Sequence, residues 1–157
     1  MKQRSQVLTI IIALVIGIPT AAAPSFTDNG DGTISDTANH LVWQKCLRGQ
    51  TSDATCSGSA TTANWDTALG YCNSLSLAGR SWRLPNVNEL KSIVDYTTSN
   101  PSIDATKFPS TVAHNYWSAT TSVGDTTKAW IVAFATGYVE SYSKASSCYV
   151  RCVSSGP

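Results

Sequence analysis

The chain has 157 residues, of which 42% are hydrophobic and 13% charged, and its formal net charge at pH 7 is +1. A nearly neutral chain lacks the clustered basic surface that binding to nucleic acid requires, so we exclude nucleic acid as a partner. The length suits one domain with its own hydrophobic core. Few charges and many Ser, Thr, Trp and Tyr residues are more typical of a secreted adhesive domain than of a cytosolic enzyme.

Residues 1–22 have the pattern of a secretory signal peptide. Two basic residues precede an apolar run over residues 7–18, and three alanines follow, ending at Ala23. This run is shorter than the roughly 20 apolar residues of a membrane-spanning helix. We expect cleavage after Ala22 and no stable membrane span afterwards, with an uncleaved N-terminal anchor as the alternative. Residues 23–157 then form a single exported domain in the periplasm, on the cell surface or outside the cell.

Residues 26–44 have the composition of three short strands. The segment 26–36 contains Asn-Gly and Asp-Gly, which tolerate the positive φ angles of tight turns, and predicts a β-hairpin. The apolar segment 41–44 predicts a further strand. Residues 47–63, which are rich in Ser, Thr and Gly, predict a loop.

Two helices are predicted next. Apolar residues recur at helical spacing over residues 65–75, and Thr62 or Asn64 can cap the start. A second helix is predicted over residues 87–96. Asn86 is its N-cap, and the glutamate three residues later completes a capping box.

The last third of the chain reads as short strands separated by polar turns. The strand segments are residues 108–109, 116–120, 129–134, 137–139 and 148–153. Strands, two helices and further strands in this order predict an α+β fold.

The five cysteines all lie in the part predicted to be exported, where disulfides are expected. Cys46 and Cys56 can close a short polar loop. Cys72, on the first helix, can pair with Cys152 in the last strand, which leaves Cys148 over. Because Cys148 and Cys152 are only four residues apart, the opposite choice stays open.

No metal or cofactor is expected. A zinc site would need more than His40 and His114, which are far apart in sequence, and no Cys-x-x-Cys pair occurs. A calcium loop starting at Asp28 is the alternative, but its third and fifth positions are Gly30 and Gly32, which have no side-chain oxygen.

Six short motifs occur in an order that resembles a known family. They are Asp28–Thr33, Leu41–Trp43, Tyr71–Cys72, Trp82–Pro85 followed by Glu89–Leu90, Tyr116–Ala119 and Tyr149–Val153. Together they resemble the Lcl C-terminal domain family, which is named after the terminal domain of a bacterial collagen-like adhesin. The resemblance covers nearly all of residues 23–157.

The second helix start and the Arg151-Cys152 ending are also similar, more distantly, to the formylglycine-generating-enzyme branch of the C-type-lectin-like fold. That resemblance implies two helices packed on a small twisted antiparallel sheet with adjacent N- and C-terminal strands. It also favours the Cys72–Cys152 bridge.

We expect no enzymatic activity, because the chain has no Gly-x-Ser-x-Gly, His-Glu-x-x-His or phosphate-binding glycine loop. The remote alternative is Cys-dependent chemistry of the sulfatase-activating type, since Cys148 and Cys152 lie close together in sequence. The segment 151–153 instead matches the terminal structural strand of the resemblance. On a strand, Arg151 would also point away from Cys152.

Ligand contacts are expected in the region from Asn115 to Lys144, since the strands and loops of lectin-like folds usually form the ligand surface. The candidate ligand-binding residues are Tyr138, Glu140 and Tyr142 by strand alternation, Lys144 beyond them, and Asp125 and Lys128 in the preceding loop. Aromatic rings can stack on sugar faces while polar neighbours fix orientation. A solvated hairpin without a ligand is the alternative.

These observations predict an exported recognition module that binds a carbohydrate or an extracellular or envelope protein. The alternative is a structural or assembly subunit of a cell-envelope or appendage complex. The sequence gives no indication of the oligomeric state.

Overall fold

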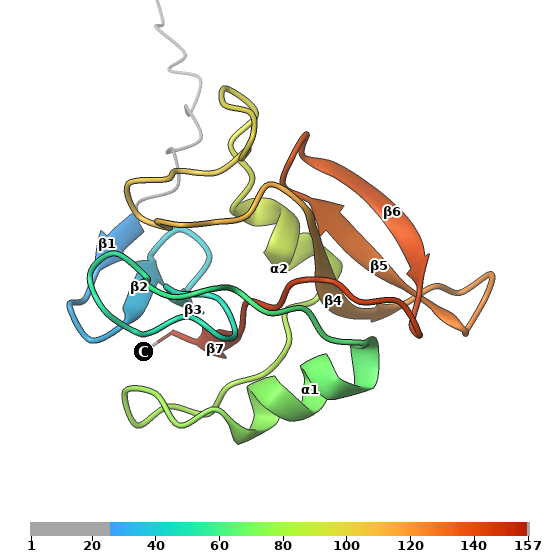
Figure 1. Cartoon of the computed structure of the whole chain (residues 1–157), viewed down its shortest axis with the longest axis horizontal. Helices are drawn as coiled ribbons and strands as arrows, with labels where there is room; N and C mark the ends of the chain where they lie inside the picture. Colours follow the sequence, from blue (N-terminus) through green and yellow to red (C-terminus); the bar gives the residue numbers. More distant parts are fainter. Residues whose placement is uncertain (1–25, 157) are drawn as a thin grey trace, which may run out of the picture.

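Two antiparallel sheets and two short helices make up residues 26–156, the part of the chain that the computed structural model describes (Figure 1). In chain order the elements are β1 Phe26–Asp28, β2 Thr33–Asp36, β3 Leu41–Gln44, α1 Trp65–Ser74, α2 Val87–Ser92, β4 Asn115–Thr121, β5 Lys128–Ala133, β6 Tyr138–Ser143 and β7 Val153–Ser155. The α+β class is therefore confirmed. The predicted signal peptide, residues 1–22, lies outside the described residues.

The first sheet has the strand order β1-β2-β3-β7 and the second has the order β4-β5-β6. We predicted one sheet in which the N- and C-terminal strands are neighbours, and both points are wrong. The terminal strands share a sheet but form its opposite edges, because β3 pairs with β2 along one side and with β7 along the other. Both helices contact the second sheet.

The C-terminal segment links the two sheets. We predicted one strand over residues 148–153, but Cys148 bridges to Ala63 and Tyr149 bridges to Tyr116, and only residues 153–155 form β7. This segment changes partner at almost every residue as it crosses from one sheet to the other. The predicted strand at residues 108–109 is also wrong, because this segment lies in turns.

Both helices begin where their capping residues predict. Asn64 accepts a hydrogen bond from the Thr67 N–H, and Asn86 forms a full capping box with Glu89. Helix α2 ends at Ser92, whereas the sequence predicted an end near residue 96. The reason is tertiary: the Asp95 N–H donates to the carbonyl of Ser102, which draws the backbone out of the helix.

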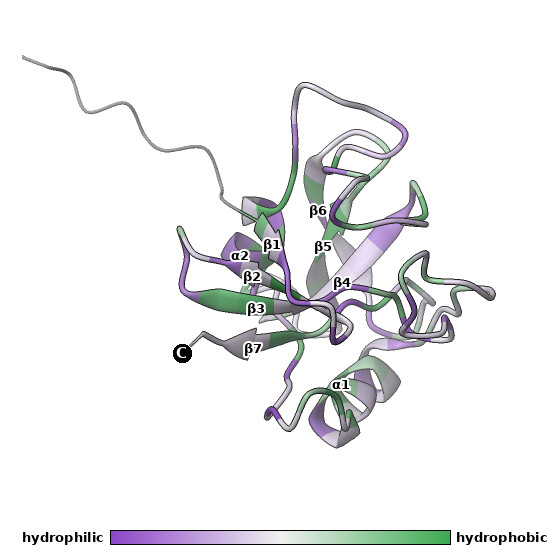
Figure 2. Ribbon diagram, turned by 90° about the vertical axis from the view of Figure 1, so that its left-hand side faces the viewer, coloured by the Kyte–Doolittle hydropathy of each residue, from purple (hydrophilic) through white to green (hydrophobic). Residues whose placement is uncertain are grey.

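The hydrophobic core has two parts. One is built around Trp43, Phe108 and Tyr116 between the first sheet and α2, and the other around Trp82 and Trp117 on the side of α1. Figure 2 shows the mainly hydrophobic β3 within the first sheet. Burial of several large aromatic side chains supplies most of the driving force for folding a domain of this size.

The structure contains the two disulfides Cys46–Cys56 and Cys72–Cys152, and Cys148 is free and buried. The second bond ties α1 to the segment before β7. Of the described residues, none belongs to a helix that is long and apolar enough to cross a membrane.

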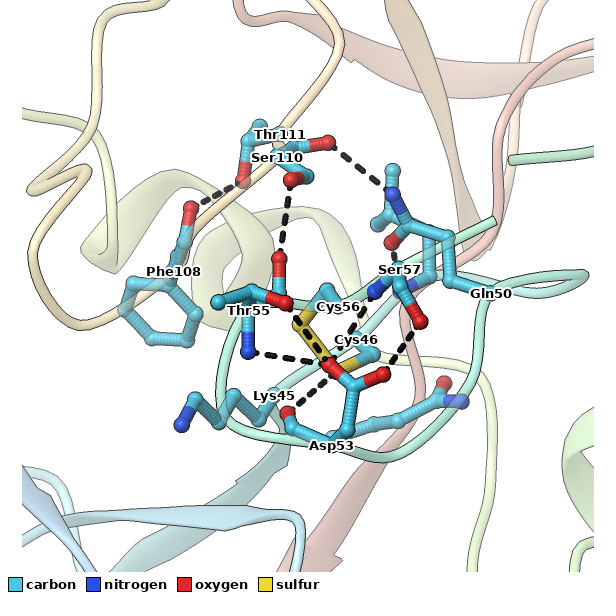
Figure 3. The surroundings of a disulfide bond; sticks show 12 residues. Lys45, Cys46, Gln50, Asp53, Thr55, Cys56, Ser57, Phe108, Ser110 and Thr111 are labelled. Carbon is cyan, nitrogen blue, oxygen red and sulfur yellow. Dashed lines mark hydrogen bonds between the residues drawn. A yellow bond between two sulfur atoms is a disulfide. The ribbon is translucent and has the colours of Figure 1, made fainter. Parts of the chain in front are cut away.

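The short disulfide closes a polar loop that is held by its own side chains (Figure 3). The Asp53 carboxylate accepts hydrogen bonds from Ser57 and Thr55, which lower its pKa to about 2. Gln50 donates to the carbonyl of Ser110, and the Ser110 hydroxyl donates to that of Thr55. These contacts fasten the loop to the segment that follows Phe108.

Arg151 is a buried cation. Its guanidinium donates to the carbonyls of Gln44 and Lys45 at 3.1 and 2.7 Å and to the Thr111 hydroxyl at 2.8 Å. It also lies 4.6 Å from the centre of the Phe108 ring. Burial lowers its pKa to about 10, so it stays charged at neutral pH. Its side chain thus joins the end of β3 to the loop before β4.

Candidate ligand-binding surface on the last hairpin

The predicted aromatic row lies on β6, the edge strand of the second sheet (Figure 1). Tyr138, Glu140 and Tyr142 are opposite Ala133, Ile131 and Ala129 of β5 and therefore share one face. All three are exposed, Tyr138 to 74% and Tyr142 to 40%. Small or apolar residues of β5 thus support a row of two tyrosines and one carboxylate.

Tyr142 and Lys144 lie at the end of β6 that is nearest α1. The Tyr142 ring is 6.3 Å from that of Trp117. The Lys144 Nζ lies 3.9 Å from the centre of the Trp65 ring and donates to the Thr121 hydroxyl at 2.9 Å. A cation held over an indole is stabilised by the charge distribution of the ring.

Trp65 also lies on this surface, although it was not among the predicted ligand-binding residues. Its place among the apolar residues of the first predicted helix favoured a core role over a sugar-stacking role. Its indole N–H donates to the carbonyl of Ser118, which fixes the ring, and the side chain is only partly buried. Its own backbone N–H donates to the carbonyl of Lys144. Only the fold brings these two residues together.

Asp125 lies in the loop between β4 and β5, whereas Lys128, which was predicted to lie in this loop, is the first residue of β5; their side chains pair at 3.4 Å. Hydrogen bonds from Thr127 are the main cause of the lowered pKa of Asp125. Both side chains are partly exposed, and the pair restrains its own loop. Val123, at the tip of this loop, is 98% exposed.

Tyr138 lies at the opposite end of β6, next to a second residue that the sequence did not single out. Tyr96 is 64% exposed, and its hydroxyl lies 3.4 Å from the carbonyl of Gly137. Gly137 has φ +79°, and a Cβ at this position would lie 2.8 Å from the Tyr96 ring. The glycine therefore lets Tyr96 lie against the turn beside Tyr138.

The environment of Cys148 is not that of a reactive thiol. It is buried, and burial together with the nearby Glu140 carboxylate raises its pKa to about 12. Cys152, the other half of the conceivable redox pair, is bonded to Cys72.

We therefore predict that iodoacetamide at pH 8 leaves Cys148 unmodified in the native protein, because the thiolate is the reactive form. Intact mass should rise by one adduct only when denaturant is added without reductant. Fast alkylation of the native protein would contradict the buried thiol.

The architecture defines a small α+β domain held by two disulfides, a type of domain found mainly in oxidising compartments. The family model of the Lcl C-terminal domain matches residues 32–154. The chain belongs to this family. Comparison with curated proteins gives no significant match.

Proposed function

We propose that this protein is an exported, non-catalytic recognition module that binds a carbohydrate ligand through the exposed face of β6. The observation that carries the proposal is the row of Tyr138, Glu140 and Tyr142, which projects from a rigid strand beside Lys144 and Trp65. Rings on a rigid strand can stack on a sugar without a large loss of conformational entropy. The carboxylate and the ammonium group can fix the orientation of sugar hydroxyls.

The fold relationship supports the same proposal. We infer a C-type-lectin-like fold from the two helices packed near a small sheet and from the bridge between the first helix and the last strand segment. Folds of this type use loops and adjacent strands to bind ligands, and β6 with its flanking loops occupies such a position. The two disulfides favour an exported location.

The test is a glycan array probed with the exported protein, purified with both disulfides intact. For a glycan that the wild-type protein binds on the array, Tyr142→Ala should weaken binding about tenfold or more, because stacking area is lost. This corresponds to at least about 1.4 kcal/mol. Tyr142→Phe keeps the ring and should retain most of the affinity.

Asn88→Ala provides the control, since Asn88 is exposed on α2 and lies outside the proposed surface. Equal losses in the Tyr142 and Asn88 variants would contradict the proposed site. An array without any binding would count against a carbohydrate ligand and favour a protein partner.

A second candidate function is that of an assembly subunit in an envelope or appendage complex. The observation that favours it is the outer edge of β6, with which no further strand pairs among residues 26–156.

A further inference from the structure

A pocket of about 210 Å³ lies between the first hairpin and the loop that the short disulfide closes. It is lined by Asp28, Gly30 and Gly32 of the hairpin, by Lys45, and by residues 52–54 of the loop. Since a water molecule takes up about 30 Å³ in the liquid, this volume equals that of roughly seven waters. The pocket therefore suits a small organic molecule of the size of one sugar ring.

Lys45 is a buried lysine whose charged end reaches this pocket. The residue is 6% exposed, and its Nζ donates to Asp28 Oδ2 at 2.7 Å. Lysines are rarely buried to this extent unless they are paired. Among the described residues, this is the one hydrogen bond that its side chain donates, although an ammonium group has three N–H groups. Donors therefore remain for a ligand, and the Asp28 oxygens keep free lone pairs beside them.

The walls of the pocket are fixed in place. The Lys45 N–H donates to the carbonyl of Gly32 at 3.0 Å, which ties the end of β3 to the hairpin turn. A Cβ at Gly32 would lie 3.2 Å from the Ser52 Cβ, so the hairpin and the loop are in close contact. The Cys46–Cys56 bond restrains the loop, and Figure 3 shows Lys45 next to it. A ligand would therefore bind without a large cost of ordering the protein.

The charges in the lining select a neutral ligand. Two carboxylates, Asp28 and Asp53, and one ammonium group give the lining a net charge of −1. The hydrogen bond from Lys45 is the main cause of the lowered pKa of Asp28, so this carboxylate is ionised at neutral pH. The carboxylates disfavour an anion. The ammonium group already occupies Asp28 and disfavours a metal cation there. A neutral molecule that both donates and accepts hydrogen bonds fits best.

We propose that this pocket binds one neutral monosaccharide unit, whose adjacent hydroxyl groups accept from Lys45 and donate to Asp28. A hydroxyl group is both a donor and an acceptor, so two neighbouring hydroxyls satisfy the ammonium group and the carboxylate together. The exposed Ser52 adds a further hydroxyl to the lining. In Figure 1 the first hairpin and β6 lie on opposite sides of the domain, so this is a second site that is independent of the β6 surface.

The test is a titration of the exported, oxidised and ¹⁵N-labelled protein, followed by amide chemical shifts. The probes are methyl α-glucoside, methyl α-mannoside and methyl β-galactoside. At least one should shift the signals of Gly30, Gly32 and Ser52, with a Kd of about 1 to 10 mM, as expected for a ligand of this size. Methyl glucuronide, which adds a carboxylate, should bind more weakly.

Two lysine variants test the role of the ammonium group. Lys45→Met keeps most of the side-chain volume but removes the charged donor, and should weaken binding about tenfold or more. Lys107→Met is the matched control. Lys107 also contributes to the lowered pKa of Asp28, but it does not line the pocket. Its replacement should change the Kd by less than about twofold.

Wild-type signals from the pocket that do not respond to any of the three neutral glycosides overturn the proposal. Shifts confined to residues 138–144 also overturn it, while they support the separate β6 surface. Tighter binding of methyl glucuronide, or equal losses in the two lysine variants, would overturn the assigned ligand class or the assigned role of Lys45. If Lys45→Met fails to fold, the wild-type shifts decide alone.

Discussion

Replacing Cys72 and Cys152 together by alanine is expected to lower the free energy of unfolding by about 4 to 5 kcal/mol, because their bond restrains a long loop in the unfolded chain. The two residues are 80 positions apart in sequence, and both side chains are fully buried. The bond joins α1 to the segment that leads into β7, so the helix and the last strand also lose a direct connection. Equilibrium unfolding in urea at pH 7 measures the change.

The matched comparison is the double replacement of Cys46 and Cys56, which are only 10 positions apart. The same relation gives a loss of about 2.5 to 3 kcal/mol for the shorter loop. A larger loss for the short loop than for the long one would contradict the chain-entropy explanation. It would indicate that the polar loop contributes chiefly through its contacts in the native state.

Replacing Arg151 by methionine is expected to destabilise the protein by about 3 to 5 kcal/mol, because it leaves two buried carbonyls without a donor, at about 1 to 3 kcal/mol each. Methionine fills part of the volume but donates no hydrogen bond. The carbonyls of Gln44 and Lys45 would then lose a donor in the interior. Unfolding with guanidinium, followed by tryptophan fluorescence, measures the loss.

Arg80→Met is the control for this second prediction. Arg80 is only partly buried, and its one side-chain hydrogen bond, to the carbonyl of Ser155, is long at 3.3 Å. Its replacement should change stability by less than about 0.5 kcal/mol. If Arg151→Met were as mild as Arg80→Met, the guanidinium would have no structural role at the end of β3.

The parts of the fold that were predictable from sequence are those fixed by local chemistry. Asn86 and Glu89 determine a helix start through contacts within one turn, and the Asn-Gly and Asp-Gly pairs determine the first hairpin. The end of α2 and the path of residues 148–153 depend on partners far away in sequence. Ser102 ends the helix, and Ala63 and Tyr116 divide the C-terminal segment between two sheets.

The residues of the candidate site also fall into those that local sequence predicts and those that only distant contacts bring together. Strand alternation alone predicted that Tyr138, Glu140 and Tyr142 share a face, because alternation is a local property of the backbone. Trp65 and Tyr96 could not be assigned from sequence. Trp65 meets Lys144 only because α1 begins beside the end of β6, and Tyr96 reaches β6 only because Gly137 leaves room for its ring.

The route of the C-terminal segment has a consequence for how the domain closes. The segment first contacts the helix α1 and the residues before it, through Lys144 and Cys148. It then contacts β4 through Tyr149 and Arg83 through Val153. β3 gains its second neighbour only when β7 is present. Both halves of the domain can therefore reach their final contacts only when residues 144–155 are in place, so one short segment closes the whole structure.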